Sequence, residues 1–471
     1  MSFVSFSFLF LFALSLGARA WIGPRKNEKA YLILLMAFSL VFYGAFIPRY
    51  LWILFFTTGV DYWAGWRIHR APGLREKRPW LVLSLTANLG LLAYFKYSGF
   101  AVDSLRSLCA SLGWGADWVP RLSPALPIGI SFFTLQSMSY TLDLYRGKLE
   151  PVRGYWRFLL FVCFYTHLVS GPIVRAKELL YQFDRRRRIR AAVWMQGAYL
   201  MILGFFLKIV VADHLAEYVD RYWVRGGAPQ MPASVPWALA FLFSCQIFAD
   251  FFGYTNIALG AAYLLGFKLP RNFNNPYLAG SFREFWTRWH ITLSRWIRDY
   301  LYLPLGGGRG GAGRAAFALM ITFLLAGLWH GAALTFLVWG AFHGLALLLE
   351  RGLGFRNMEG RSPLLRAGWF LVVQLGILVS WVFFRASDIP QGFRFLANMT
   401  GPSFAWGDLL RILPAFLFAA PVLVLHVRGF LAERGWFPAP GGREKAVWAA
   451  AMLYAVLTLY GKNNAFIYFQ F

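Results

Sequence analysis

The run AAFALMITFLLAGLWHGAALTFLVWGAFHGLALLL, residues 315–349, decides the fold class of this sequence. It is apolar except for four polar breaks, at Thr322, His330, Thr335 and His343. About 20 consecutive apolar residues are enough for a helix to cross a bilayer. The run therefore predicts two membrane spans that meet near His330, or one long kinked element.

The rest of the chain has the same character. Of its 471 residues 58% are hydrophobic and only 14% are charged, whereas soluble domains usually contain about 25% charged residues. Further apolar runs bring the number of near-spanning stretches to about a dozen. Because no long polar linker, repeat or low-complexity segment divides them, we predict a single membrane-embedded domain over residues 1–471. The predicted fold is all-α, a polytopic helix bundle with about 11–13 membrane segments, some of them re-entrant or interfacial.

The basic residues indicate how the chain is oriented. The formal net charge is +26, and the clearest basic cluster, Arg185–Arg188 with Arg190, lies in a short loop between two apolar stretches. Basic loops beside membrane spans are typical of the cytoplasmic face, where they meet anionic lipid headgroups. We therefore expect this loop and the loop 309–314 to be cytoplasmic, and we expect membrane lipid rather than nucleic acid as the partner of these charges.

The amino-terminal sequence MSFVSFSFLFLFALSLGARA imitates a signal peptide. It lacks a positive region before its apolar stretch, and Arg19, Arg25, Lys26 and Lys29 follow that stretch instead. This arrangement favours a retained first span whose amino terminus lies outside. The three cysteines have no paired spacing, so no disulfide framework or thiolate metal site is predicted.

Two histidines stand out by their surroundings. His330 lies between Gly327 and Gly331, and an ionisable residue inside a membrane segment is by default a functional candidate. The glycines would allow a substrate or a neighbouring backbone to come close. The alternative for His330 is a core histidine bonded to a carbonyl. His343, near Glu350 and Arg351, looks interfacial.

The second candidate, His290, lies in the segment SFREFWTRWHITLSRWIRDYLYLPLGG. Aromatic and aliphatic residues recur there at helical spacing, which predicts one amphipathic helix at the cytoplasmic interface. Its opposite stripe is polar and comprises Arg283, Thr287, His290, Ser294 and Arg298. The alternative is that His290 is simply one polar residue on a wet face.

These two histidine segments, NFNNPYLAGSFREFWTRWHITLSRWIRDYLYLPLGG and GLWHGAALTFLVWGAFHG, resemble those of the membrane-bound O-acyltransferases. The likeness covers nearly the whole chain, including PIGISFFTLQSMSYTLDLYRG, FVCFYTHLVSGPIVRAKELL and the terminal FIYFQF. Within the family, the sequence is most similar to the membrane subunits that serve O-acetylation of bacterial alginate.

The resemblance implies a helix bundle around a central tunnel in a bacterial inner membrane. It implies that His330 is the catalytic histidine and that His290 is a second important histidine toward the cytoplasm. It also implies acetyl-CoA as the cytoplasmic acyl donor, with no permanently bound cofactor and no metal. Arg283, Ser294 and Arg298 are the candidates for holding the CoA phosphates, although these arginines also suit lipid anchoring. His330 could act as general base or as acetyl-carrying nucleophile.

The resemblance further implies that the acetyl group is passed outward to periplasmic partner proteins, which modify the polysaccharide. The external stretches around 102–125 and 213–235 are too short to form a polymer groove of their own. Their aromatic residues Trp114, Trp118, Tyr222 and Trp223 are candidates for a docking patch.

The resemblance leaves alternatives open. Another acceptor is possible within the family: peptidoglycan, cellulose, or teichoic acid with D-alanine as the acyl group. Outside enzymes the alternative is a polysaccharide or lipid transporter, because broken helices and intramembrane histidines are typical of transporters too.

Overall fold

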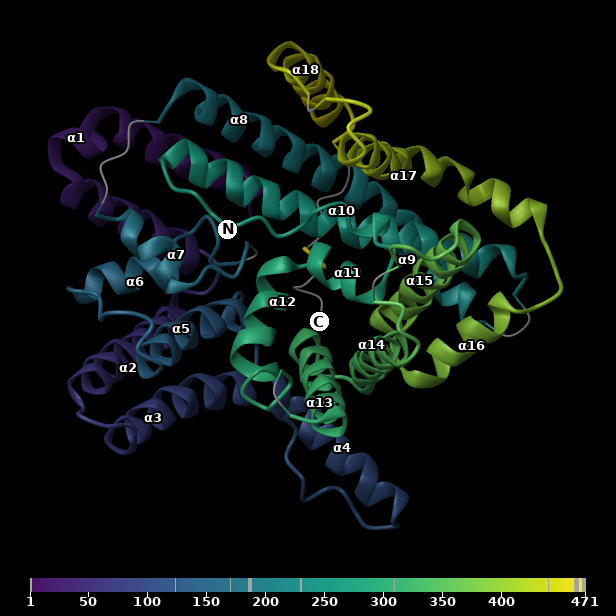
Figure 1. Ribbon diagram of the computed structural model, residues 1–471, viewed down its shortest axis with the longest axis horizontal. Helices are drawn as coiled ribbons and strands as arrows, with labels where there is room; N and C mark the ends of the chain where they lie inside the picture. The colour runs from purple at the N-terminus through teal and green to yellow at the C-terminus, as the bar shows by residue number, and fades with distance from the viewer. Residues whose placement is uncertain are drawn as a thin grey trace. The chain divides into compact units, whose positions relative to one another are not determined.

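The computed structural model describes residues 2–122, 124–169, 171–184, 189–228, 231–308, 310–356, 358–438, 440–460 and 466–467; the side chains of residues 23–26 and 225 also lie outside this description. Within these ranges the chain forms helices and no strand, which confirms the predicted all-α class (Figure 1). Arg185–Arg188 and Arg309, on which the two loop predictions depend, lie outside the described residues.

The chain divides into two compact units, Met1–Ala198 with Ala258–Pro270 and Tyr199–Ile257 with Arg271–Phe471. Whether the two units form one domain over residues 1–471 depends on how they are placed relative to one another, so the single domain stays a prediction. The first unit contains α1 (Phe6–Gly44), η1 (Pro48–Tyr50), α2 (Leu51–Arg70), α3 (Leu74–Leu92), η2 (Ala93–Tyr97), α4 (Ser98–Ser111), α5 (Ile130–Tyr145), α6 (Tyr155–Cys163), α7 (Ala176–Leu179), η3 (Leu180–Gln182) and the first half of α8 (Ala191–Phe205).

The second unit contains most of the remaining helices. They are η4 (Phe206–Ala212), α9 (Asp213–Gly226), the first part of α10 (Ser234–Leu265), η5 (Pro276–Leu278), α11 (Phe282–Arg288), α12 (Ile291–Ile297), η6 (Arg298–Tyr302), α13 (Ala312–His330), α14 (Leu334–Gly352), α15 (Pro363–Arg385), α16 (Ile389–Met399), α17 (Trp406–Glu433) and α18 (Gly442–Thr458).

Six of the described helices are long and apolar enough to cross a membrane: Ala191–Val224, Ser234–Leu265, Ala312–His330, Leu334–Gly352, Pro363–Arg385 and Trp406–Glu433. The amino-terminal apolar stretch, Phe6–Ile22, is shorter, but α1 continues through the basic residues to Gly44. Six of the 11–13 membrane segments expected from sequence thus correspond to described helices of spanning length. The chain is a polytopic membrane protein.

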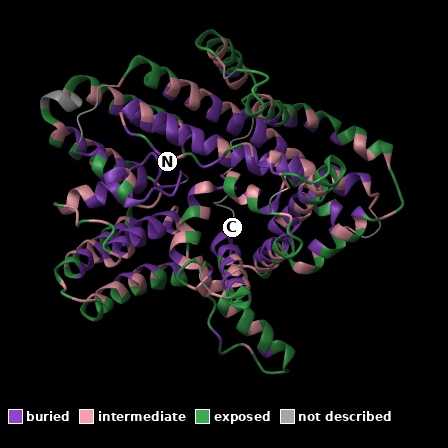
Figure 2. Cartoon of the chain, in the orientation of Figure 1, coloured by how far each residue is buried: buried purple, intermediate pink, exposed green. Residues whose placement is uncertain are grey.

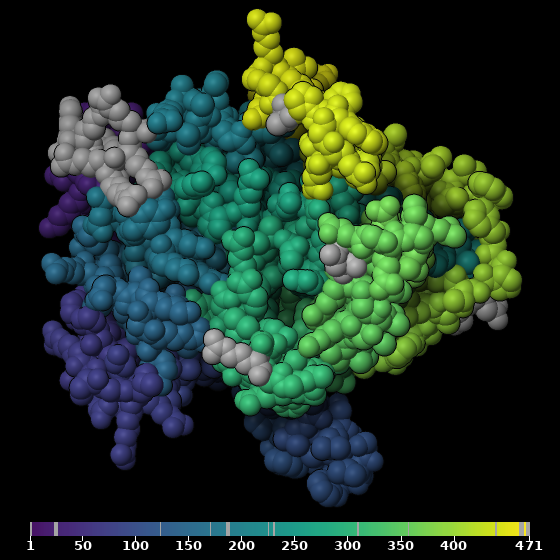
Figure 3. Space-filling model, viewed as in Figure 1, coloured from purple at the N-terminus to yellow at the C-terminus, as the bar shows by residue number. Residues whose placement is uncertain are grey.

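The membrane-spanning helices differ in how much of their length is buried inside the protein. Of the most apolar stretch of α10, 83% is buried, whereas 28% of the corresponding stretch of α17 is buried. Figure 2 shows the same contrast. Helix α18 follows α17 and presents mainly exposed side chains (Figure 3). In a membrane protein the apolar residues of such outer helices face lipid, so their exposure is expected.

The first unit is held by a buried polar centre. The Asp61 carboxylate of α2 accepts hydrogen bonds from Ser84 Oγ at 2.6 Å and Asn88 Nδ2 at 2.8 Å, both on α3, and from Ser137 Oγ on α5. A buried carboxylate requires such donors, since leaving a buried charge unsatisfied is costly. Three helices are thereby fixed to one another around Asp61.

Candidate active site

His330 is the last residue of α13 and is 3% exposed. Three aromatic rings surround its imidazole: the ring centroids of Trp329, Trp339 and Phe384 lie 5.0, 5.1 and 5.3 Å from its own. Trp339 belongs to α14 and Phe384 to α15. The helices α13, α14 and α15 therefore enclose His330 among aromatic rings, in the interior of the protein.

The glycines beside His330 allow α13 and α14 to pack closely (Figure 1). A Cβ atom on Gly327 would lie 2.2 Å from the Phe336 carbonyl oxygen, and one on Gly340 would lie 2.3 Å from the Phe323 carbonyl oxygen. On Gly331, a Cβ would lie 2.0 Å from the Phe336 ring. Of the two reasons considered for these glycines, close approach of a neighbouring backbone is the one that the structure supports.

His290 lies at a break between two helices. The prediction of one amphipathic helix through this segment is wrong, because α11 ends at Arg288 and α12 begins at Ile291. His290 itself has φ 42° and ψ 52°, in the left-handed region that non-glycine residues rarely adopt. The alternative that it faces solvent is also wrong, since its side chain is 0% exposed.

Asn272 stabilises this break. Its backbone carbonyl accepts the Ile291 N–H at 2.9 Å. Its side-chain Oδ1 accepts the N–H and the hydroxyl of Thr292, at 3.2 and 2.9 Å, and lies 3.1 Å from His290 Nδ1. The first N–H groups of α12 thus find their acceptors on a distant segment, which ends the preceding helix and turns the His290 ring inward.

Aromatic rings connect the two candidate histidines. The Trp329 ring centroid lies 6.1 Å from that of His290 and 5.0 Å from that of His330, and Phe251 of α10 packs edge-on against His290 at 4.7 Å. Burial lowers the pKa of His290 to about 3, so its imidazole is neutral at pH 7. The structure therefore gathers both predicted histidines around one tryptophan.

His343 belongs to the same aromatic cluster, which the sequence analysis did not foresee. It is completely buried, its Nε2 lies 3.2 Å from Ser380 Oγ, and its ring lies 4.8 Å from Trp339 and 5.1 Å from Trp286. The available signal was the four-residue spacing of Trp339 and His343, which places both on one face of α14.

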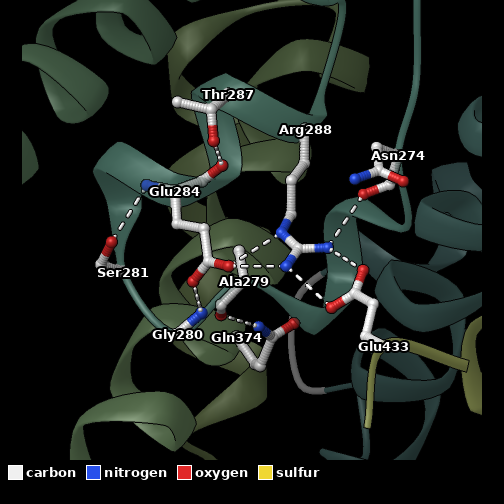
Figure 4. A network of polar contacts seen from close by, with 9 residues as sticks. All are labelled: Asn274, Ala279, Gly280, Ser281, Glu284, Thr287, Arg288, Gln374 and Glu433. Carbon is white, nitrogen blue, oxygen red and sulfur yellow. Dashed lines mark hydrogen bonds and ion pairs between the residues drawn. The ribbon is translucent and has the colours of Figure 1, made fainter. Parts of the chain in front are cut away.

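Charged residues that the sequence analysis also missed anchor α11. The Glu350 carboxylate, buried on α14, accepts the Phe282 N–H at 2.5 Å and the Arg283 N–H at 3.1 Å at the start of α11. At its other end, Arg288 makes a two-pronged ion pair with Glu433 of α17, at 2.6 and 3.0 Å. Figure 4 shows Arg288 between Glu433, Glu284 and the Asn274 carbonyl. A bidentate contact of this kind restrains the orientation of the Arg288 side chain as well as compensating its charge.

The three predicted CoA-contacting residues have different environments. Arg283 and Arg298 are exposed, and Arg298 pairs with the adjacent Asp299 at 2.7 Å. Ser294 is half-buried and its hydroxyl donates to the Trp289 carbonyl at 3.3 Å. Arg283 has basic neighbours that were not predicted: burial lowers the pKa of Arg356, and the positive charges of Arg351 and Arg283 lower it further.

The structure corrects one member of the predicted docking patch. Trp223 is 4% exposed and stacks on Phe395 with ring centroids 4.5 Å apart, so it is part of a core rather than of a surface. Trp114 and Trp118 are well exposed and Tyr222 is half-buried. No group of three or more potential metal ligands occurs within the described ranges.

Comparison with known proteins assigns the chain to a family. The membrane-bound O-acyltransferase family model matches residues 130–367, which include both candidate histidines. The chain is 38% identical over 413 residues to a probable alginate O-acetylase of Pseudomonas putida, covering 87% of this chain and 81% of that protein. It is 32% identical over 426 residues to a peptidoglycan O-acetyltransferase of Helicobacter pylori, covering 85% and 78%. A teichoic acid D-alanyltransferase of Bacillus subtilis is 27% identical over 54% of this chain and 68% of its own length.

The comparisons agree with the geometry, since all three relatives are named as acyl-transferring enzymes and the matched region carries the buried histidines. The comparisons therefore favour an enzyme over the alternative of a polysaccharide or lipid transporter. This multi-pass membrane protein is an O-acyltransferase and belongs to the membrane-bound O-acyltransferase family.

Proposed function

We propose that this protein takes acetyl from acetyl-CoA at the cytoplasmic face of a bacterial inner membrane and passes it across for O-acetylation of an exported polysaccharide, with alginate as the acceptor. The observation that carries the proposal is the pair of buried histidines, His290 and His330, gathered around Trp329. Such an enclosed imidazole suits thioester chemistry, because excluding water protects the acyl group from hydrolysis.

Support for alginate comes from the relatives. The probable alginate O-acetylases of Pseudomonas putida and Azotobacter vinelandii match 87% of this chain at 38% and 37% identity. The peptidoglycan O-acetyltransferase, at 32% identity over most of the chain, makes peptidoglycan the second candidate acceptor. The D-alanyltransferase matches only about half of the chain, which favours acetyl over D-alanyl as the group transferred.

The donor site belongs, in this proposal, at the start of α11. Arg283 and Arg351 both lie close enough to Arg356 for their charges to act on it. Guanidinium groups donate charged hydrogen bonds that suit the phosphates of CoA. Ser294 of α12 and Arg298 at the start of η6 are the second pair of candidate contacts.

The chemistry assigned to the histidines is acyl transfer from sulfur to oxygen. A neutral imidazole takes the proton of the attacking hydroxyl, the hydroxyl oxygen forms a bond to the thioester carbonyl carbon, and the carbon–sulfur bond breaks. The leaving thiolate then regains the proton. Alternatively a ring nitrogen of His330 attacks the thioester carbonyl, the carbon–sulfur bond breaks and the CoA thiolate leaves. The hydroxyl then takes the acetyl group from the imidazole, and its proton is released as the nitrogen–carbon bond breaks. A radiolabelled acetyl group trapped on the wild-type protein but not on His330→Gln would establish the second route.

We also propose that periplasmic partner proteins are needed to modify the polysaccharide, and reconstitution tests this. Purified protein in liposomes, given labelled acetyl-CoA and alginate, should leave the polymer essentially unmodified until the periplasmic partner proteins are added. Efficient acetylation by the protein alone would refute the partner requirement. If no combination releases CoA thiol from acetyl-CoA, the proposed donor is wrong, and if peptidoglycan rather than alginate becomes acetylated, the proposed acceptor is wrong.

A further inference from the structure

The side chain of Asn272 contacts the imidazole ring of His290. Asn272 lies in the segment after α10, is 1% exposed, and its side chain contacts both His290 and Thr292. No role was predicted for it from the sequence.

The contacts of Asn272 identify the atom that faces His290. The Thr292 backbone N–H can only donate, so the Asn272 atom 3.2 Å from it must be an acceptor, the side-chain oxygen. Turning the amide over would place its NH₂ group against that N–H. The same oxygen lies 3.1 Å from His290 Nδ1, and two acceptors cannot share a hydrogen bond. Nδ1 therefore carries a proton and donates a hydrogen bond to Asn272 Oδ1.

A neutral imidazole carries one ring proton, and burial keeps His290 neutral at pH 7. With that proton on Nδ1, the lone pair is on Nε2. The ring's described neighbours Phe251 and Trp329 bear no charge. The titratable residues next to these contacts in the sequence are Asp250, Arg271, Arg288 and His330. Asp250 pairs with Lys208 at 2.9 Å, and Arg288 pairs with Glu284 and Glu433.

The backbone at this point also depends on Asn272. Non-glycine residues in the left-handed region are strained, and such residues persist only where surrounding contacts hold them. The contacts from Asn272 to Ile291 and Thr292 begin directly after the strained residue. One residue thus holds both the ring and the backbone that directs it.

We propose that Asn272 is a positioning residue that fixes His290 as the Nδ1-protonated tautomer, so that Nε2 is the nitrogen that exchanges a proton during acyl transfer. The proposal rests on the proposed function in one respect, that His290 takes part in the reaction. The proton that Nε2 accepts comes from the attacking hydroxyl and returns to the leaving thiolate, so no further reactant is required.

The first test compares two substitutions at the same hydrogen-bonded centre. Asn272→Leu removes the acceptor at similar volume, and kcat should fall by about 10–100-fold, as when an orienting partner of a histidine is lost. Thr292→Val is the matched control, because it removes one donor to the same oxygen and leaves the contact with His290. It should reduce kcat no more than about threefold, the loss of one ordinary hydrogen bond. Equal effects of the two substitutions would overturn the proposal.

The second test uses Asn272→Asp, which keeps an acceptor for Thr292 and for Nδ1. A carboxylate beside the imidazole favours its charged form, so the pKa of His290 should rise. Because the reaction requires the neutral ring, the acidic limb of kcat should move to higher pH, with activity recovering as pH increases. A uniform loss of kcat at every pH would indicate a merely structural role and would overturn the proposal.

The third test reads the tautomer directly and remains decisive if Asn272→Leu fails to fold. In protein labelled with ¹⁵N-histidine, protonated and bare ring nitrogens have distinct chemical shifts, and the His290 signals are those lost in His290→Gln. The wild type should show a protonated Nδ1 and a bare Nε2; the reverse assignment would overturn the proposal. If His290→Gln retains full transfer, it is the role of His290 that fails, whereas an essential His290 with an unaffected Asn272→Leu contradicts the positioning role alone.

Discussion

Trp329 contacts both candidate histidines and so connects the two parts of the candidate site. It precedes His330 in α13, and its ring also contacts His290, which lies far from it in the sequence. The imidazoles of both histidines are packed against the faces and edges of aromatic rings. Burial lowers the pKa of His290, so its imidazole is neutral at pH 7.

At this scale, His330→Ala should abolish acetyl transfer while the protein still inserts and accumulates. The substitution removes the imidazole that the rings of Trp329, Trp339 and Phe384 surround. Polymer acetylation and protein level in membranes are the measurements. His69→Ala, at a partly exposed position beside Glu150, is the control and should leave transfer unchanged. Wild-type acetylation by an accumulated His330→Ala protein would contradict the assignment.

At the scale of elements, the crossing of α13 and α14 depends on glycine. Gly327→Ala should destabilise the protein by about 1–3 kcal/mol, because the added methyl group meets the Phe336 carbonyl and forces a backbone shift. Gly368→Ala, on an exposed face of α15 with nothing within 4 Å of the new Cβ, is the control. It should be neutral or stabilising by up to about 1 kcal/mol, since alanine favours helix. Thermal unfolding in detergent compares them, and equal midpoints would count against this view of the crossing.

The attachment of α11 to α17 is a second dependence between elements. Arg288→Lys keeps the positive charge but loses the two-pronged contact with Glu433, and the Glu433 carboxylate now raises the pKa of Arg288 above its usual range. Because Glu433 is partly exposed, we expect a loss of the order of 1 kcal/mol in stability, together with reduced transfer, since α11 leads directly to His290.

The control for Arg288→Lys is Arg411→Lys, whose pair with Asp408 is long, at 3.8 Å, and exposed. It should change neither the unfolding midpoint nor the rate of transfer. If Arg288→Lys behaves like Arg411→Lys in both measurements, the Arg288–Glu433 contact does not hold α11 in its functional position.

For the whole molecule, the open question is which loops face the cytoplasm. Arg187 lies in the basic loop outside the described residues, and Arg187→Cys should resist a membrane-impermeant thiol reagent applied to sealed cells. Asp117→Cys, at an exposed position in the stretch expected outside, should react. The native cysteines Cys109, Cys163 and Cys245 are all buried, so background labelling should be low. Ready labelling of Arg187→Cys would overturn the predicted orientation.

The sequence by itself determined that this is an all-α, multi-pass membrane protein and selected His330 and His290. Those conclusions depend on local quantities: an apolar run of spanning length identifies a membrane helix, and an ionisable residue within apolar surroundings is conspicuous in any sequence. The resemblance to the acyltransferases rests on the same segments, and the comparisons confirmed it.

Only the tertiary structure decided how those segments are used. Helical periodicity continues through Trp289 and His290, yet the helix breaks there because Asn272, from another segment, supplies the acceptors for Ile291 and Thr292. Burial of His343 and Trp223, and the capping of α11 by Glu350, likewise depend on partners distant along the chain. Periodicity records which face of a helix is apolar, but the contacts that end a helix or bury one residue come from elements whose position no local pattern contains.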